Sequence, residues 1–154
     1  MKACIRHIEG HTFVAKSDSN HWIPFDTGTA SGGSASANDP VQLFIIAAGG
    51  CVSIDVLDIL KKGRKTFTLY ELNLEAVRAE TDPKIVRSLC YNVKINGENI
   101  TEDNVRRAIT LSLTKYCSVS LSIDRSVTFK ARITLNGMRG QIFEIPRDSS
   151  IYEH

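Results

Sequence analysis

The sequence lacks a strong excess of charge of either sign. Its 19 Lys and Arg residues oppose 17 Asp and Glu residues, a formal net charge of +2 at pH 7. Proteins that bind nucleic acid normally carry a marked basic stripe, so we expect no nucleic-acid partner. Hydrophobic residues make up 42% and charged residues 23%, close to the averages of globular proteins, which argues against a disordered or fibrous chain.

Two further absences concern secretion and membranes. The first residues run directly into alternating sequence, without the apolar core of a signal peptide. The longest apolar run, 41–60, contains Asp55 and Asp58, and each carboxylate would cost about 2.5–3.5 kcal/mol at a bilayer centre. We therefore expect a cytoplasmic protein that neither spans nor binds a membrane.

Cysteine is present but sparse. Four residues, Cys4, Cys51, Cys90 and Cys117, are too few in 154 for a small domain held together by disulfides. In a reducing compartment they are expected to be free thiols unless they do redox work. A single intracellular cysteine is most often a small buried apolar residue, and we interpret Cys4 and Cys90 in this way.

The length and the hydrophobic pattern predict a single domain over 1–137. Short strands occupy residues 2–25, with a turn at Glu9-Gly10, and a segment rich in Gly, Ser and Ala follows as a mobile loop. Asp39 and Pro40 are typical of a helix start, and the helix is expected to extend to residue 62. Its apolar residues cover nearly the whole circumference, which predicts a buried central helix.

The second half alternates strands and helices irregularly. Strands are predicted at 69–76, with a bulge near Tyr70, at 85–95 and at 127–135; helical segments are predicted at 101–116 and 117–122. Without regular strand-helix-strand alternation, this order favours an α+β fold with an antiparallel sheet. Residues 138–154 are expected to form a weakly ordered tail.

Gly49 and Gly50 precede Cys51 inside the predicted central helix. They cost about 1 kcal/mol each relative to Ala there, so they either admit a close neighbour or break the helix and place Cys51 at a new helix start. A helix start lowers thiol pKa values and populates the nucleophilic thiolate. Cys117 also precedes a short helical segment, so the two cysteines could meet as an attacking and a resolving thiol.

Other candidate sites are weaker. Strand alternation places Cys4 and His7 on opposite faces, so no metal site is expected there, and we predict no metal and no cofactor. Asp55 and Asp58 lie one helical turn apart and could pair with Lys62 or Lys61 at helical spacing, which favours surface ion pairs.

Three stretches carry a resemblance to a known family. They are Asp39-Pro40-Val41-Gln42-Leu43 through Ala47-Ala48-Gly49-Gly50-Cys51, Ile54-Asp55-Val56-Leu57-Asp58-Ile59-Leu60-Lys61-Lys62-Gly63-Arg64, and Lys115-Tyr116-Cys117-Ser118-Val119-Ser120. Together they resemble the OsmC/Ohr family, and within it the YhfA-like branch, over roughly residues 1–135. The resemblance implies an OsmC-like α+β fold, with a sheet wrapped around the central helix in an intertwined homodimer.

The resemblance also implies an activity. Members of this family reduce organic hydroperoxides with two cysteines at the subunit interface: Cys51 would attack the peroxide and Cys117 would resolve the sulfenic acid as a disulfide, which a dithiol reductant then reopens.

The sequence departs from the family pattern in one respect. The family's peroxidases have an Arg before the central helix and a Glu just after its first Pro, but no Arg lies between Arg6 and Arg64, and Val41 and Gln42 follow Pro40. Gln42 can hydrogen-bond a substrate, but it cannot hold an arginine by charge. The alternative is therefore a catalytically silent domain that binds a small apolar ligand at the dimer interface.

Overall fold

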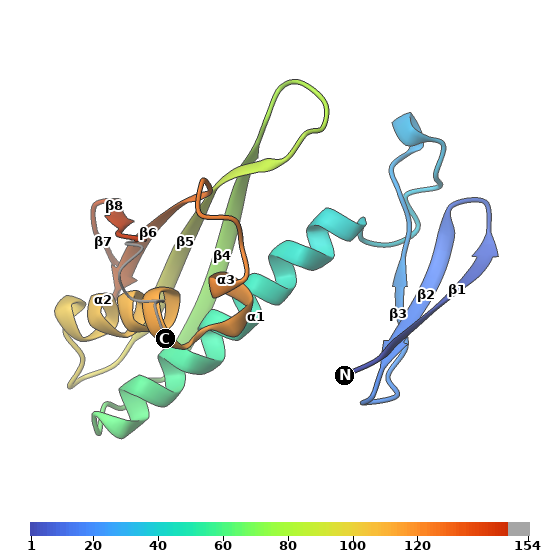
Figure 1. Cartoon of the computed structure of the whole chain (residues 1–154). Helices are drawn as coiled ribbons and strands as arrows, with labels where there is room; N and C mark the ends of the chain where they lie inside the picture. The colour runs from blue at the N-terminus through green and yellow to red at the C-terminus, as the bar shows by residue number, and fades with distance from the viewer. Residues whose placement is uncertain (148–154) are drawn as a thin grey trace, which may run out of the picture. The chain divides into compact units, whose positions relative to one another are not determined.

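The computed structural model describes residues 1–147. The chain divides into two compact units, residues 1–46 and the residues from 47 onward, and each is described by itself (Figure 1). The single domain over 1–137 stays a prediction.

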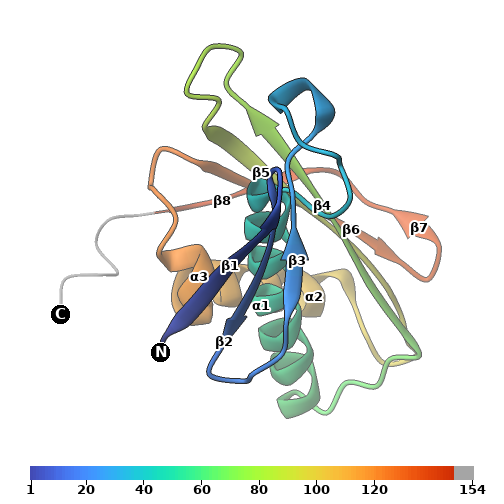
Figure 2. The same ribbon diagram turned by 90° about the vertical axis from the view of Figure 1, so that its right-hand side faces the viewer.

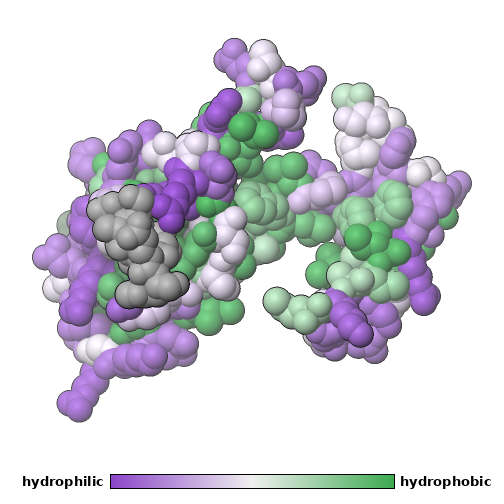
Figure 3. Space-filling model, in the orientation of Figure 1, coloured by the Kyte–Doolittle hydropathy of each residue, from purple (hydrophilic) through white to green (hydrophobic). Residues whose placement is uncertain are grey.

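The first unit is built on a three-stranded antiparallel sheet in the order β1 (Ala3–Glu9), β2 (Thr12–Ser17), β3 (Ile23–Phe25). Gly10 has a φ of +54° in the turn between β1 and β2, as the Glu9-Gly10 pair predicts. Every residue of β1 is exposed in the single chain, Ile5 and Ile8 included. Figure 3 shows apolar side chains gathered over this sheet.

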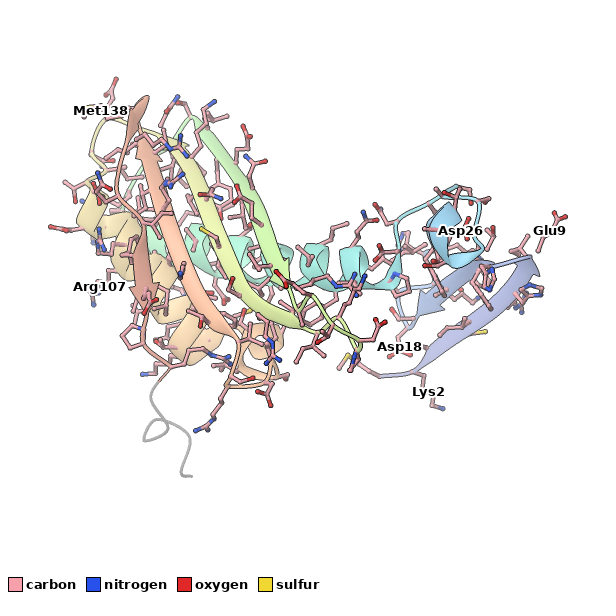
Figure 4. The ribbon with its side chains drawn as sticks, turned by 90° about the horizontal axis from the view of Figure 1, so that it is seen from above. Lys2, Glu9, Asp18, Asp26, Arg107 and Met138 are labelled. Carbon is pink, nitrogen blue, oxygen red and sulfur yellow. The ribbon has the colours of Figure 1, made fainter. Side chains whose placement is uncertain are left out.

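The Gly- and Ser-rich segment after β3, which includes the short helix η1 (Thr29–Ser31), has a hydrogen-bonded centre. The buried Asp26 carboxylate accepts hydrogen bonds from the backbone N–H of Thr27 and from the backbone and hydroxyl groups of both Ser34 and Ser36. These bonds, the Ser34 hydroxyl foremost, hold the pKa of Asp26 well below its usual range. Composition alone predicted a mobile loop; the loop instead folds around this carboxylate (Figure 4).

The long helix α1 (Pro40–Lys62) begins where the sequence predicts. The Asp39 carboxylate accepts from the backbone N–H of Gln42, while the Gln42 side chain accepts from the backbone N–H of Asp39, a reciprocal cap. The helix continues through Gly49 and Gly50, so the predicted alternative of a break before Cys51 is wrong. The other alternative is confirmed at Gly49, where an added Cβ would lie 3.3 Å from a methyl of Leu72.

One stripe of α1 is buried within the chain, formed by Ala48, Gly49, Val52, Val56 and Leu60. The opposite side is open, and Ile54 is 65% exposed. The prediction of a helix buried all round is therefore wrong for the single chain. By length and composition alone α1 could also cross a bilayer, but its buried stripe packs on protein.

The second unit contains a five-stranded mixed sheet: β4 (Leu69–Arg78), β5 (Val86–Asn96), β6 (Thr128–Leu135) and β7 (Met138–Arg139) in that order, with β8 (Phe143–Ile145) also pairing with β6. The predicted antiparallel sheet needs correction, because β5 and β6 run parallel. Their connection contains α2 (Glu102–Leu111), the π-helical turn η2 (Ser112–Tyr116) and α3 (Ser118–Leu121), a crossover long enough for parallel pairing. The helices lie on one face of the sheet (Figures 1 and 2).

The predicted bulge near Tyr70 is also wrong. Strands β4 and β5 keep one register from Leu69 to Val77, and the shift falls between Val77 and Arg78. Tyr70 belongs to the inward-facing set of even positions, and its hydroxyl donates to the Ser53 hydroxyl on α1 at 3.2 Å.

Residues 138–147, which the sequence analysis assigned to a weakly ordered tail, form β7 and β8; residues 148–154 lie outside the described part. Asn136 and Gly137 both have positive φ and form the two-residue hairpin turn that an Asn-Gly pair favours. The Arg147 guanidinium then donates to the backbone carbonyls of Ser120 and Ile123 and lies 4.1 Å from the ring centre of Phe129. Hairpin pairing and these contacts order the segment.

Candidate functional site

The site is built on the buried side of α1. Cys51 and Asp55 lie four residues apart, so both side chains project from one face of the helix. Both are half-buried. β4 approaches α1 closely at Gly49, two residues before Cys51 and on a different side of the helix, and this contact fixes α1 against the sheet.

Cys117 comes from the crossover between β5 and β6. The turn η2 closes with a hydrogen bond from the backbone N–H of Cys117 to the carbonyl of Ser112, and Cys117 then caps α3. Its Sγ accepts from the backbone N–H of Ser120 at 3.3 Å. The side chain is fully buried, and burial raises the pKa of the Cys117 thiol to about 11, with the neighbouring Cys51 thiol adding to the increase. Burial thus outweighs the helix start, which alone would lower a thiol pKa.

These elements bring three reactive side chains together. The Sγ atoms of Cys51 and Cys117 and a carboxylate oxygen of Asp55 all lie within 4.8 Å of one another. The buried Ser112 hydroxyl donates to Asp55 Oδ2 at 2.8 Å and so orients the carboxylate. No disulfide links Cys51 and Cys117, and both are free thiols.

Two buried hydroxyls lie beside the thiols. Tyr91, on β5, is completely buried, and burial raises its pKa to about 12; Ser120, Cys117 and Cys51 are among the neighbours that influence it. The Tyr91 hydroxyl lies near that of Ser120, but neither has a hydrogen-bond partner of normal geometry. The two hydroxyls are thus proton donors next to the sulfur atoms, and the Ser120 hydroxyl influences both Tyr91 and the Cys117 thiol.

A cavity of about 490 Å³ lies on the helical side of the second unit and shares one residue, Asp55, with the site. It lies between α1 and the segment formed by α2 and η2, and its wall contains Asp55, Leu60, Lys62, Arg107 and Tyr116. Figure 4 shows Arg107 on the outer side of α2. The Asp55 carboxylate belongs both to this cavity and to the thiol cluster.

The remaining sequence candidates lie elsewhere. Gln42, the predicted substrate-binding residue, is exposed and uses its side-chain oxygen to cap α1. Cys4 is exposed on β1, so its interpretation as a buried apolar residue is wrong for the single chain. Cys90 is half-buried on the polar face of β5, where burial, and then the charge of Glu75, raise its pKa. Within residues 1–147 neither Cys4 nor Cys90 joins the thiol cluster.

Sequence reasoning missed two members of the site, Asp55 and Ser112. The predicted pairing of Asp55 with Lys61 or Lys62 does not form within the described residues, where Asp55 makes no ion pair. The four-residue spacing from Cys51 was the available signal, since it places the carboxylate on the thiol's face of the helix. No local pattern identified Ser112, because only the packing of η2 on α1 brings it to Asp55.

The Cys51 thiol on α1 and the buried Cys117 thiol lie beside the Asp55 carboxylate, and the second unit has a mixed sheet with helices on one face. These features define a dithiol protein of the α+β class. Comparison with known families narrows the assignment: the model for OsmC-like proteins matches residues 32–132. The chain therefore belongs to the OsmC-like family.

Individual relatives agree with this assignment. The chain is 35% identical to Protein YhfA of Escherichia coli strain K12 over 127 residues, 82% of this chain and 92% of the relative. A crystal structure of a hypothetical protein from Aquifex aeolicus matches 87% of this chain and 94% of its own with a TM-score of 0.76 and 25% identity. An organic hydroperoxide resistance protein from Elizabethkingia anophelis matches 87% and 94% with a TM-score of 0.65; at 15% identity it shows a common fold.

Proposed function

We propose that the protein reduces an organic hydroperoxide with Cys51 and Cys117 as its redox pair. The observation that carries the proposal is the distance between the two sulfur atoms, no more than 4.8 Å although the residues come from different elements. A disulfide needs the sulfurs about 2.0 Å apart, a movement of under about 3 Å. The hydroperoxide resistance proteins with the same fold support this choice of substrate class.

The burial of the two thiols supports different roles for them. Cys51 is half-buried and open to a small substrate, whereas Cys117 has no exposed surface and a raised pKa. The Cys51 thiolate attacks the terminal peroxide oxygen, the O–O bond breaks, and the departing alkoxide takes a proton to become an alcohol. Cys51 is then a sulfenic acid.

Cys117 completes the oxidation. Its sulfur attacks the sulfenic Sγ of Cys51, the S–S bond forms, and the hydroxyl leaves as water with the Cys117 proton. The two thiols thus supply the two electrons that reduce the peroxide. A dithiol reductant returns both residues to thiols by exchange and becomes a disulfide itself.

Proton donors at the site support the chemistry in the absence of the family's arginine. The Tyr91 hydroxyl is protonated at neutral pH, as any tyrosine is, and burial raises its pKa further, to about 12. A buried hydroxyl without a fixed acceptor can donate to a thiolate or to the leaving oxygen as charge develops. In this proposal Tyr91 takes part of the role that a positive charge has in related peroxidases.

The oligomeric state and the cellular location of the protein are inferred from the family resemblance. Each unit leaves large apolar side chains open, among them Ile5 and Ile8 in the first and Ile54 and Val77 in the second, and a homodimer would cover such surfaces. We infer a cytoplasmic homodimer that binds neither nucleic acid nor membrane, with Gln42 contributing to the substrate site.

The test measures consumption of cumene hydroperoxide by the reduced protein with a dithiol reductant. The proposal expects turnover in the wild type and in Cys90→Ser, a thiol variant outside the site, and at least about a 100-fold loss in Cys51→Ser. Without the reductant, Cys117→Ser should consume about one equivalent and keep a sulfenic acid at Cys51, where the wild type forms the disulfide. No consumption by the wild type would reject the proposal and favour the silent, ligand-binding alternative.

A further inference from the structure

The thiol cluster has the composition of a metal site as well as of a redox pair. Within residues 1–147, Cys51, Asp55 and Cys117 form the one group of three or more possible metal ligands with their atoms within 4.8 Å of one another. Zinc accepts both thiolate sulfur and carboxylate oxygen as ligands in proteins. The prediction of no metal rested on Cys4 and His7, which lie outside this cluster of Cys51, Asp55 and Cys117.

The distances suit a small cation. Three atoms that all lie within 4.8 Å of one another have a common point no more than about 2.8 Å from each, and Zn²⁺ binds sulfur at about 2.3 Å and carboxylate oxygen at about 2.0–2.2 Å. Side-chain movements of about half an ångström would close this difference. Cys51 and Asp55, four residues apart on a rigid helix, supply two of the ligands already aligned.

The surroundings also suit a bound cation. The Ser112 hydroxyl holds Asp55 Oδ2, as the outer hydrogen bonds of metal sites hold their ligands. Asp55 also lines the 490 Å³ cavity, although neither cysteine does, so the carboxylate is the ligand nearest to this open space. The thiolates favour zinc over Mg²⁺ or Ca²⁺, which prefer oxygen donors.

We propose that the reduced protein binds one Zn²⁺ through Cys51, Cys117 and Asp55. Binding replaces the two thiol protons, which pass to solvent, and no electron is transferred. The bound ion occupies the sulfur lone pairs that the peroxide reaction needs, so zinc and hydroperoxide compete for the same thiols. Zinc binding does not depend on the proposed peroxidase activity.

The first experiment uses the wild-type chain and its own cysteines as controls. The reduced protein is alkylated with iodoacetamide, with and without one equivalent of Zn²⁺, and each cysteine is followed by mass spectrometry. The proposal expects at least about a tenfold slower reaction at Cys51 and Cys117, restored by a chelator, and no change at Cys4 and Cys90. Mg²⁺ should protect none of them. Equal rates with and without zinc would reject the site.

A calorimetric titration with Zn²⁺ then tests the carboxylate. Asp55→Asn should weaken binding at least about tenfold, whereas Asp58→Asn, at an exposed position of the same helix, should bind as the wild type does. The far-ultraviolet circular dichroism of each variant checks its fold. Unchanged affinity in a folded Asp55→Asn would reject the three-ligand site. Zinc binding without peroxide turnover would reject the proposed activity and leave the metal site standing.

Discussion

Replacing Tyr91 with Phe should stabilise the protein, although it removes a polar group from the core. The Tyr91 hydroxyl is completely buried and has no hydrogen-bond partner of normal geometry. Leaving a buried hydroxyl unsatisfied costs about 1–3 kcal/mol. Because the Ser120 hydroxyl lies near enough to recover part of this cost, we expect a gain at the lower end, about 1 kcal/mol in the free energy of unfolding. That gain corresponds to a rise in Tm of about 2–4 °C for a chain of this size.

Tyr70→Phe is the matched control. The Tyr70 hydroxyl donates to Ser53, so its removal should cost about 0.5–1.5 kcal/mol. Urea and thermal unfolding should be measured at one protein concentration, because association would shift both transitions. A higher free energy of unfolding in Tyr91→Phe and a lower one in Tyr70→Phe would support the view that only the Tyr91 hydroxyl lacks a hydrogen-bond partner. A Tyr91→Phe variant that is less stable than the wild type would show that its hydroxyl is satisfied and would refute the reasoning about free proton donors in the site.

Three further predictions concern packing, pH and thiol access. Gly49→Val should lower the free energy of unfolding by about 1–3 kcal/mol, because the new side chain overpacks against β4. Gly50→Ala should raise it by about 0.5–1 kcal/mol, because nothing lies within 4 Å of an added Cβ there. Equal effects of the two variants in thermal unfolding would contradict the close approach of β4 at Gly49. The folded pKa of Asp26 is below its unfolded value, so its stabilisation is complete above about pH 4 and is lost as pH falls further; urea unfolding should show a weaker acid dependence between pH 5 and 3 in Asp26→Asn, and an unchanged dependence would refute its role. Iodoacetamide at pH 7.5 should modify Cys4 first and Cys117 last, since one is exposed and the other is buried with a raised pKa; early labelling of Cys117 would contradict its burial.

Local signals predicted the elements of the fold well. Asp39 and Pro40 marked the start of α1 because capping depends on adjacent residues, and Thr101 caps α2 for the same reason. The Asn136-Gly137 turn was an equally local signal that the sequence analysis did not use, and it would have predicted the hairpin of β6 and β7.

Pairing between distant segments was harder to predict. The alternation of apolar residues in β5 and β6 indicates that each strand has one buried face. The same alternation occurs whether two neighbouring strands run parallel or antiparallel, so it does not predict their relative direction. Burial of α1 was overpredicted because an apolar circumference does not say which side is covered by the same chain.

The sequence predicted the two cysteines of the candidate site but not Asp55 or Ser112. Cysteine is rare in this sequence, so the contexts of Cys51 and Cys117 stood out, and the structure places their sulfurs together. Aspartate is common on helix surfaces, and Lys62 follows Asp55 two turns further along the same helix, so a surface ion pair was the simpler interpretation. The contact with Ser112 depends on how η2 packs on α1.

The most direct test of the redox pair is the identity of the disulfide formed by one equivalent of cumene hydroperoxide. The reduced protein is oxidised, its remaining thiols are alkylated, and its peptides are mapped without reduction. The account predicts one intramolecular bond between Cys51 and Cys117, with Cys4 and Cys90 alkylated, and a sulfenic acid trapped at Cys51 in Cys117→Ser. Four alkylated thiols, or a bond that includes Cys4 or Cys90, would contradict it.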